Sequence, residues 1–329
     1  MDTQPIKATI CTFSHLHICT FTKHLHINLK MCNFAHYIFT LITIVTTDFT
    51  HLRNLLAPLY GEQEARSMAF IVFEDAFGVS RTDIYADKVR QFSESERQTF
   101  LNMCSQLAAG EPLQYVIGHT TFCGHQFMVT PEVLIPRPET EELVDWTIET
   151  AQTLSLPHPT RLLDAGTGSG CIAISLQLAM PQAEIEAWDI SPSALQVAQS
   201  NATRLQVPVR FYERDILAID DEVSSTPLFD LIVSNPPYIC QREAVDMEDN
   251  VLQHEPHTAL FVPNDDPLRF YRALAHHAQR RLRSGGALLV ELNRAYAEAT
   301  AQLFRDMGLT HVELRRDAYG NERMCRAFR

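Results

Sequence analysis

The chain of 329 residues has few positive charges, no Cys-x-x-Cys pair and no long apolar run. Its 27 lysine and arginine residues stand against 40 aspartate and glutamate residues, which gives a net charge of −13. Nucleic acid is bound mainly by clustered basic side chains, so direct nucleic-acid binding is not expected. Beyond Lys30 the only lysine is Lys88, and a broad phosphate-binding face is therefore not predicted.

The eight cysteines and the apolar segments exclude several further classes of protein. Without a Cys-x-x-Cys pair, neither a zinc knuckle nor a redox motif is indicated. The apolar run 38–45 is too short to cross a bilayer and lacks a small-residue cleavage site, so membrane insertion and secretion are not expected. The composition is typical of a cytoplasmic enzyme with reduced thiols and about two domains.

The first 48 residues differ from the rest of the chain. They contain no arginine, five of the 14 histidines and no sustained helical period. The pairs His15-x-His17 and His24-x-His26 lie near three cysteines, which is compatible with a metal site, but the spacings do not repeat as in a zinc finger and no metal is expected. We interpret residues 1–48 as an upstream extension with little ordered structure, and a misassigned start codon is one origin for it.

Residues 49–114 are predicted to form a small helical bundle. The first helix has an apolar stripe at Leu52, Leu55, Leu56 and Leu59. A second stripe runs from Ala69 to Phe77. Ser93-x-x-Glu96 is typical of a capping box, and Gly110 of a helix end.

Residues 115–138 are predicted to form a β-hairpin linker, because apolar residues alternate there with glycine and proline. Pro136-Arg137-Pro138-Glu139 then marks a helix start, where proline and carboxylates are favoured. The apolar positions of this helix are Leu143, Val144, Ile148 and Ala151. It opens the third predicted domain, residues 139–329.

A glycine-rich loop follows the predicted strand 161–164 and precedes an apolar helix that begins at Cys171. The loop residues are Gly166, Thr167, Gly168, Ser169 and Gly170. Glycines allow close approach of a ligand to the backbone, and the first turn of a helix offers N–H groups to it. A dinucleotide fingerprint would place glycine or alanine at Cys171, so a nicotinamide cofactor fits this loop imperfectly.

Two acidic residues follow the next two predicted strands. Asp189 ends the strand 184–189, the position from which a carboxylate binds two ribose hydroxyls. Asp215 and Ile216 follow the strand 209–214 and suit an adenine, whose amine donates a hydrogen bond and whose face packs on apolar side chains. Together with the glycine loop, these residues predict a nucleoside-bearing cofactor.

The turn Asn235-Pro236-Pro237-Tyr238 follows the apolar strand 229–233. Its two prolines fix φ and remove two backbone donors, so the Asn235 side chain and nearby carbonyls present hydrogen-bond acceptors. A planar NH2 group matches such acceptors, and the ring of Tyr238 offers a flat surface against it. Because the nitrogen lone pair of an amide is delocalised, holding both N–H bonds favours an attack-ready nitrogen.

These motifs in this order resemble a class I S-adenosylmethionine-dependent methyltransferase that acts on a planar amino nitrogen. Three further stretches, 111–118, 133–141 and 317–323, narrow the resemblance to the peptide chain release factor N5-glutamine methyltransferases, the HemK/PrmC family. The resemblance covers about residues 50 to 329. It implies a cytoplasmic enzyme of protein methylation and translation termination, with release factors as partners, that methylates the glutamine of their GGQ loop.

The resemblance also implies a seven-stranded, Rossmann-like α/β sheet with a reversed last strand, here 324–328, beside the helical domain and the hairpin linker. The cofactor that the resemblance implies is S-adenosylmethionine. The glycine loop, Asp189, Asp215, Ile216 and Asn235 are expected to bind it. Asn235, Pro236 and Tyr238 are expected to act in catalysis, and the whole turn with Arg137 to bind substrate.

Several alternatives remain open at this point. Arg137 either contacts substrate or cofactor or forms a surface ion pair. The helical bundle is a structural cap, a platform for a protein substrate, or both. A ribosomal-protein glutamine methyltransferase and a nucleic-acid adenine methyltransferase share the motif set, although the latter normally needs a base-flipping pocket and a basic surface. A non-catalytic cofactor-binding partner has no need of the Asn235 turn.

Overall fold

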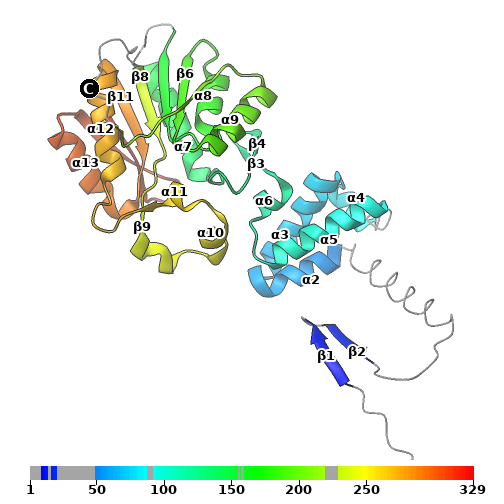
Figure 1. Cartoon of the computed structure of the whole chain (residues 1–329). Coiled ribbons are helices and arrows are strands. Elements are labelled where there is room, and N and C mark those ends of the chain that lie inside the picture. The colour runs from blue at the N-terminus through cyan, green and yellow to red at the C-terminus, as the bar shows by residue number, and fades with distance from the viewer. Residues whose placement is uncertain are drawn as a thin grey trace, which may run out of the picture.

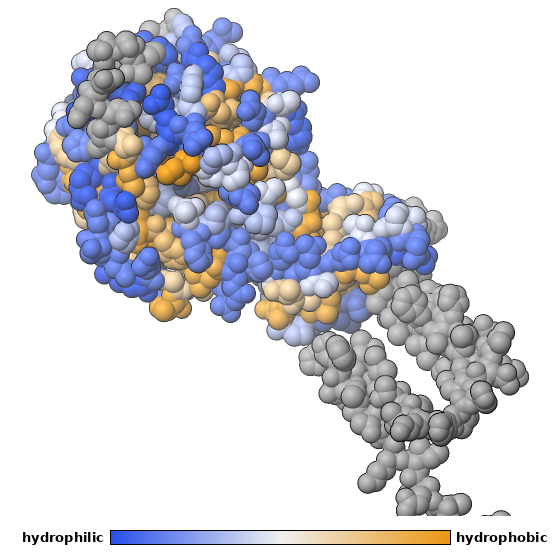
Figure 2. Space-filling model, in the orientation of Figure 1, coloured by the Kyte–Doolittle hydropathy of each residue, from blue (hydrophilic) through white to orange (hydrophobic). Residues whose placement is uncertain are grey.

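The computed structural model describes residues 9–13, 16–20, 49–86, 92–154, 156, 159–218 and 229–329. A helical domain lies beside a larger α/β domain, and the chain passes from one to the other through the short helix α6 (Leu113–Ile117) and the hairpin of β3 (His119–Phe122) and β4 (His125–Met128) (Figure 1). Hydrophilic side chains dominate the visible face of the α/β domain, with apolar groups in smaller patches (Figure 2). In the part of the chain that is described, no helix is long and apolar enough to span a membrane.

The helical domain is built around a buried aromatic core. Its elements are α2 (Phe49–Tyr60), α3 (Glu62–Ile71), the π-helical turn η1 (Val72–Ala76), α4 (Arg81–Tyr85), α5 (Glu94–Ala108) and α6 (Leu113–Ile117). Leu52, Leu56, Phe73 and Phe100 are fully buried. The predicted capping box is confirmed, because the Ser93 hydroxyl accepts the Glu96 N–H and the Glu96 carboxylate accepts the Ser93 N–H.

The prediction for the end of α2 was wrong in one position. Leu59, assigned to the buried stripe, is 56% exposed. The helix ends at Tyr60, and Gly61 at φ 81° turns the chain directly into α3. Its last turn therefore lies at the edge of the bundle, where periodicity alone does not decide burial.

The linker is shorter than predicted. The hairpin consists of β3 (His119–Phe122) and β4 (His125–Met128), which pair antiparallel. Residues 115–117, predicted as extended, belong to α6 instead. Gly118 ends this helix in the left-handed region, and the Tyr115 hydroxyl donates to the Val133 carbonyl over 2.6 Å. A tertiary contact thus stabilises a helical turn that is too short to be recognised from its pattern.

The predicted seven-stranded sheet is confirmed, with strand order β12-β13-β11-β8-β5-β6-β7. Its strands are β5 (Arg161–Ala165), β6 (Glu184–Asp189), β7 (Arg210–Glu213), β8 (Phe229–Ser234), β11 (Leu282–Glu291), β12 (Thr310–Arg316) and β13 (Glu322–Phe328). β13 runs antiparallel to both of its neighbours, β12 and β11, whereas the other neighbouring strands of this sheet pair parallel. The reversed last strand is therefore the one expected.

Helices cover both faces of the sheet (Figure 1). They are α7 (Pro138–Thr153), α8 (Cys171–Ala179), α9 (Pro192–Leu205), α12 (Arg269–Arg281) and α13 (Ala297–Asp306). Alternate residues of β8 enter opposite cores: Leu231 and Val233 pack with α7 and α8, and Ile232 packs with α12 and α13. Two buried faces explain why these strands are apolar throughout, as is usual for parallel sheets.

Short elements form one wall beyond the carboxyl end of β8. They are β9 (Ile239–Cys240), η3 (Gln241–Asp246), α10 (Asp249–His254), α11 (His257–Leu260), β10 (Phe261–Val262) and η4 (Arg294–Tyr296). β9 and β10 pair parallel. This pairing brings the residues after the Asn235 turn beside the segment that precedes α12.

The predicted extension contains strands that the sequence analysis did not expect. β1 (Thr9–Phe13) and β2 (Leu16–Thr20) pair antiparallel. Both are rich in β-branched and apolar residues, which favour strands. The remaining residues of 1–48, which include His15, His24 and His26 of the metal site considered there, lie outside what the structure describes.

Candidate functional site

The glycine loop connects β5 to α8 and needs its glycines for different reasons. A Cβ on Gly170 would lie 2.9 Å from Ile174 Cδ1 and 3.1 Å from Ala198 Cβ. Gly170 therefore allows α8 to pack on α9. A Cβ on Gly168 would meet nothing within 4 Å, although its φ of 53° is unfavourable for other residues. Gly168 thus presents its backbone to open space.

The Asp164 side chain stabilises the glycine loop through hydrogen bonds. Its Oδ2 accepts hydrogen bonds from the Thr167 hydroxyl, at 2.7 Å, and from the Ala173 N–H, at 3.2 Å. The side chain is fully buried, and burial raises its pKa to about 7, against the effect of these two donors. Asp164 thereby joins the end of β5, the loop and the first turn of α8.

Asp189 lies at the carboxyl end of β6 and faces the loop. Its Oδ2 accepts the Gly168 N–H at 2.8 Å, and its Oδ1 accepts the Ser191 N–H at 2.9 Å. Burial raises its pKa, and these N–H donors oppose that effect. Each carboxylate oxygen can accept a further hydrogen bond, so the group is oriented and still able to bind hydroxyls.

Asp215 and Ile216 follow β7, as predicted. Asp215 Oδ1 accepts the Leu217 N–H at 2.8 Å, which fixes the turn. Ile216 is 6% exposed. Phe270 of α12 lines the same cavity as these residues and adds an aromatic surface.

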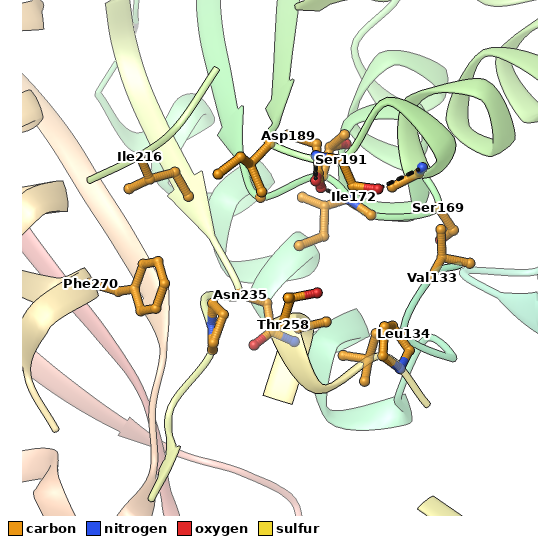
Figure 3. A pocket seen from close by; sticks show the side chains of 18 of the residues that line it. Val133, Leu134, Ser169, Ile172, Asp189, Ser191, Ile216, Asn235, Thr258 and Phe270 are labelled. Carbon is orange, nitrogen blue, oxygen red and sulfur yellow. Dashed lines mark hydrogen bonds between the residues drawn. The ribbon is translucent and has the colours of Figure 1, made fainter. Parts of the chain in front are cut away.

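These elements surround a cavity of about 340 Å³. In Figure 3 the labelled side chains surround it, with Asp189 above the opening and Asn235 and Thr258 below. The predicted residues that line it are Arg137, Gly166, Thr167, Gly168, Ser169, Asp189, Asp215, Ile216, Asn235 and Pro237. Gly170 is not among the lining residues, which agrees with its role in helix packing.

A second cavity, of about 210 Å³, lies on the other side of the Asn235 turn. Pro236 and Tyr238 line it, with residues from β9, α10 and α11. Asn235 and Arg137 line both cavities. The turn therefore separates one space bordered by the glycine loop from another bordered by the short helices.

A buried carboxylate lies behind the turn. Glu291 accepts the Thr140 hydroxyl at 2.6 Å and the Tyr238 hydroxyl at 2.9 Å. Asn235 Nδ2 donates in turn to Thr140 Oγ1 at 3.1 Å. Burial raises the pKa of Glu291 and, together with the Glu291 charge, raises that of Tyr238 well above its ordinary value. The Tyr238 phenol thus stays protonated and remains a donor.

Arg137 forms an ion pair with Glu255, whose side chain is almost completely buried. Glu255 also accepts the Ile135 N–H at 3.2 Å. The ion-pair alternative for Arg137 is therefore found, but its partner is a buried carboxylate, and Arg137 also lines both cavities. It ties the chain before α7 to the wall formed by α10 and α11.

The sequence analysis missed two kinds of residue at this site. Phe270, Leu217 and Ile190 form apolar lining that only the fold brings together. Thr140 and Glu291 hold the Asn235 turn from behind, although Glu291 carried a signal as a charged residue ending an otherwise apolar strand. No cluster of three or more potential metal ligands occurs among the described residues.

Two family models and several curated proteins match this chain. Residues 50–118 match the family model described as PrmC N-terminal domain, and residues 148–258 match the Methyltransferase small domain. A release factor glutamine methyltransferase of Bacteroides thetaiotaomicron is 40% identical over 279 residues, which cover 85% of this chain and 98% of that protein. A protein of the same name from Bordetella pertussis is 40% identical over 280 residues, or 85% and 99% of the two chains.

One solved structure is also among the proteins to which this chain is similar. It is a release factor-specific protein-(glutamine-N5) methyltransferase of Alicyclobacillus acidocaldarius, which is 30% identical and covers 62% of this chain and 99% of its own, with a TM-score of 0.37. The sequence matches extend over nearly the whole length of the curated relatives, across both the helical and the α/β domain. The chain belongs to the release factor glutamine methyltransferase family.

Proposed function

We propose that this chain transfers a methyl group from S-adenosylmethionine to the side-chain amide nitrogen of the glutamine in the GGQ loop of peptide chain release factors. The names of its relatives support the substrate. The observation that carries the proposal is the place of Asn235, which lines both cavities. A methyl donor in the first cavity and an amide in the second would meet at this side chain.

The residues around the first cavity fit S-adenosylmethionine. The open space at Gly168 admits a ligand against the loop backbone, and the oriented Asp189 carboxylate suits the two ribose hydroxyls. Asp215 suits the adenine amine, while Ile216 and Phe270 suit the adenine face. When bound, this cofactor supplies a methyl group on a positively charged sulfur, which is already activated for transfer.

The protein's own contribution is position and electrostatics. Asn235 accepts one N–H of the substrate amide through Oδ1, and the Pro236 carbonyl accepts the other. The Tyr238 ring packs against the amide plane, and its hydroxyl is fixed by Glu291. Because the proton can leave after methylation, no general base is assigned. Arg137 contacts the substrate or cofactor from the shared border of the two cavities.

The proposed methylation belongs to translation termination in the cytoplasm. The helical domain, which matches the PrmC N-terminal model, is a platform for the release factor as well as a cap on the fold. Acidic net charge agrees with a protein substrate rather than nucleic acid.

The test uses purified enzyme with labelled S-adenosylmethionine and, in separate reactions, a release factor, a glutamine-bearing ribosomal protein and duplex DNA. Mass spectrometry locates the added methyl group. The expected product carries one methyl on the GGQ glutamine of the release factor and is not formed by Asn235→Ala. Methylation of only the ribosomal protein or only DNA would refute the proposed substrate, and no methylation at all would refute the activity.

A further inference from the structure

The Asn235 side chain is connected to a buried carboxylate through a single hydroxyl. Asn235 Nδ2 lies 3.1 Å from Thr140 Oγ1, which lies 2.6 Å from Glu291 Oε2. Thr140 belongs to the first turn of α7, and Glu291 ends β11. They are 2% and 1% exposed, so water does not compete for these bonds. Three segments distant in sequence thus meet behind the predicted catalytic turn.

The chemistry of these groups fixes the direction of each hydrogen bond. An ionised carboxylate only accepts, so the one proton of the Thr140 hydroxyl points at Glu291. Thr140 Oγ1 can then only accept from Asn235. The Asn235 amide must turn its NH2 edge to Thr140, which places Oδ1 on the opposite edge. This orientation of the Asn235 amide follows from which of the three groups can donate a hydrogen bond. It does not depend on distinguishing the amide nitrogen from the amide oxygen by shape.

Burial raises the pKa of Glu291, and several neighbouring groups favour its ionised form against that effect. Tyr238 donates a second hydroxyl to it, over 2.9 Å. The positive charge of Arg323 on β13 also lowers its pKa, while burial and the charge of Glu139 on α7 raise it. Tyr271 of α12 donates to the Glu291 backbone carbonyl. The carboxylate therefore receives two hydroxyl protons and faces one guanidinium.

We propose that Thr140 and Glu291 are positioning residues that hold the Asn235 amide oxygen toward the substrate nitrogen. The inference rests on the proposed function and deepens it. Glu291 also anchors Tyr238, so a single carboxylate orients both the acceptor and the ring that flank the substrate amide. Neither residue reacts with the substrate; each acts through Asn235 or Tyr238.

The test compares three variants of one helix. Thr140→Val removes the hydroxyl at nearly constant volume, and Thr140→Ser retains it. Thr147→Val is the matched control, because Thr147 is also fully buried in α7 but, among the described residues, its hydroxyl bonds only to the Leu143 carbonyl of its own helix. We expect Thr140→Val to lower kcat about tenfold, as for the loss of one orienting hydrogen bond. The Kd for S-adenosylmethionine and the KM for the release factor should not change.

The Thr140→Ser variant distinguishes a loss of positioning from a loss of packing. Thr140→Ser should restore most of kcat, and Thr147→Val should keep it at the wild-type value. Wild-type kcat in Thr140→Val would overturn the proposal. So would a loss that Thr140→Ser shares in full, or a loss confined to cofactor affinity.

Glu291→Gln tests the carboxylate independently. A neutral amide offers one acceptor oxygen to two hydroxyls, so kcat should fall, and the double variant with Thr140→Val should be no slower than the slower single variant. In the wild type, kcat should fall as the pH drops through the pKa of Glu291, which burial places above the ordinary 4.5. Fully additive losses, or an unchanged acid limb in Glu291→Gln, would contradict the proposal.

A readout without turnover distinguishes this inference from the proposed function. The side-chain NH2 resonances of Asn235 can be assigned by NMR through their absence in Asn235→Ala. They should shift in Thr140→Val and stay in place in Thr147→Val. Unshifted resonances would overturn the network whatever the substrate is, whereas the proposed function fails only if the release factor is not methylated.

Discussion

The Gly168 N–H, in the loop after β5, donates to the Asp189 carboxylate at the end of β6, with 2.8 Å between nitrogen and oxygen. This bond joins the carboxyl ends of two neighbouring strands and orients the carboxylate before any ligand arrives. An oriented acceptor loses less conformational freedom on binding. The same bond also explains how the largely buried Asp189 carboxylate remains able to accept hydrogen bonds from hydroxyls.

Asn235→Ala should lower kcat by about a hundredfold or more, the scale seen when one preorganised hydrogen-bonding group is removed from a reaction centre. The affinity for S-adenosylmethionine should change little, because the loop and Asp189 remain. Single-turnover kinetics with a release factor, together with calorimetric cofactor titration, measure both quantities. Unchanged turnover would exclude Asn235 from catalysis.

Replacing Gly170 or Gly168 of the loop by alanine should affect different properties of the protein. Gly170→Ala forces a Cβ to within 2.9 Å of Ile174 and 3.1 Å of Ala198, so the free energy of unfolding should decrease. Gly168→Ala meets no atom within 4 Å, and its main effect should be weaker binding of S-adenosylmethionine, beyond the backbone strain that both variants share. Denaturant titration and calorimetry compare the pair. Equal losses of stability would contradict the assigned roles.

Asp164 should make the stability of the fold depend on pH. Its pKa is raised by burial from 3.8 to about 7, so the folded state holds this proton more tightly than the unfolded chain. Its contribution to stability is present at pH below 3.8 and is lost as the pH rises to about 7. The free energy of unfolding of the wild type should therefore decline over this range relative to Asp164→Asn, as measured by urea titration. Parallel curves would show that Asp164 titrates normally.

Deletion of residues 1–47 should leave the activity intact. The match to the PrmC N-terminal model begins at residue 50, and α2 begins at Phe49. The comparison is of kcat and soluble yield between the full chain and the shortened chain. A large loss of kcat or of soluble yield would show that residues 1–47 contribute to the activity or the stability of the enzyme.

Much of the α/β domain follows from local sequence. Apolar strands, the glycine loop, Asp189 and the Asn235 turn all occur at positions that short patterns identify, because strand ends and tight turns impose local backbone requirements. The resemblance to the methyltransferase family then implied the order of the strands. Two local predictions were wrong: Leu59 was placed in the apolar stripe of α2 but is exposed, and residues 115–117 were predicted as extended but form a helix.

The sequence by itself determined which residues form the glycine loop, the acidic strand ends and the Asn235 turn, since each lies within one short segment. Only the tertiary structure decided what supports them. Thr140 and Glu291 are 151 residues apart in the chain but share one hydrogen bond behind Asn235. Phe270 and Ile216 likewise come from separate elements yet line the same cavity. Such contacts depend on the packing of α7 and α12 on opposite faces of the sheet, which no local pattern encodes.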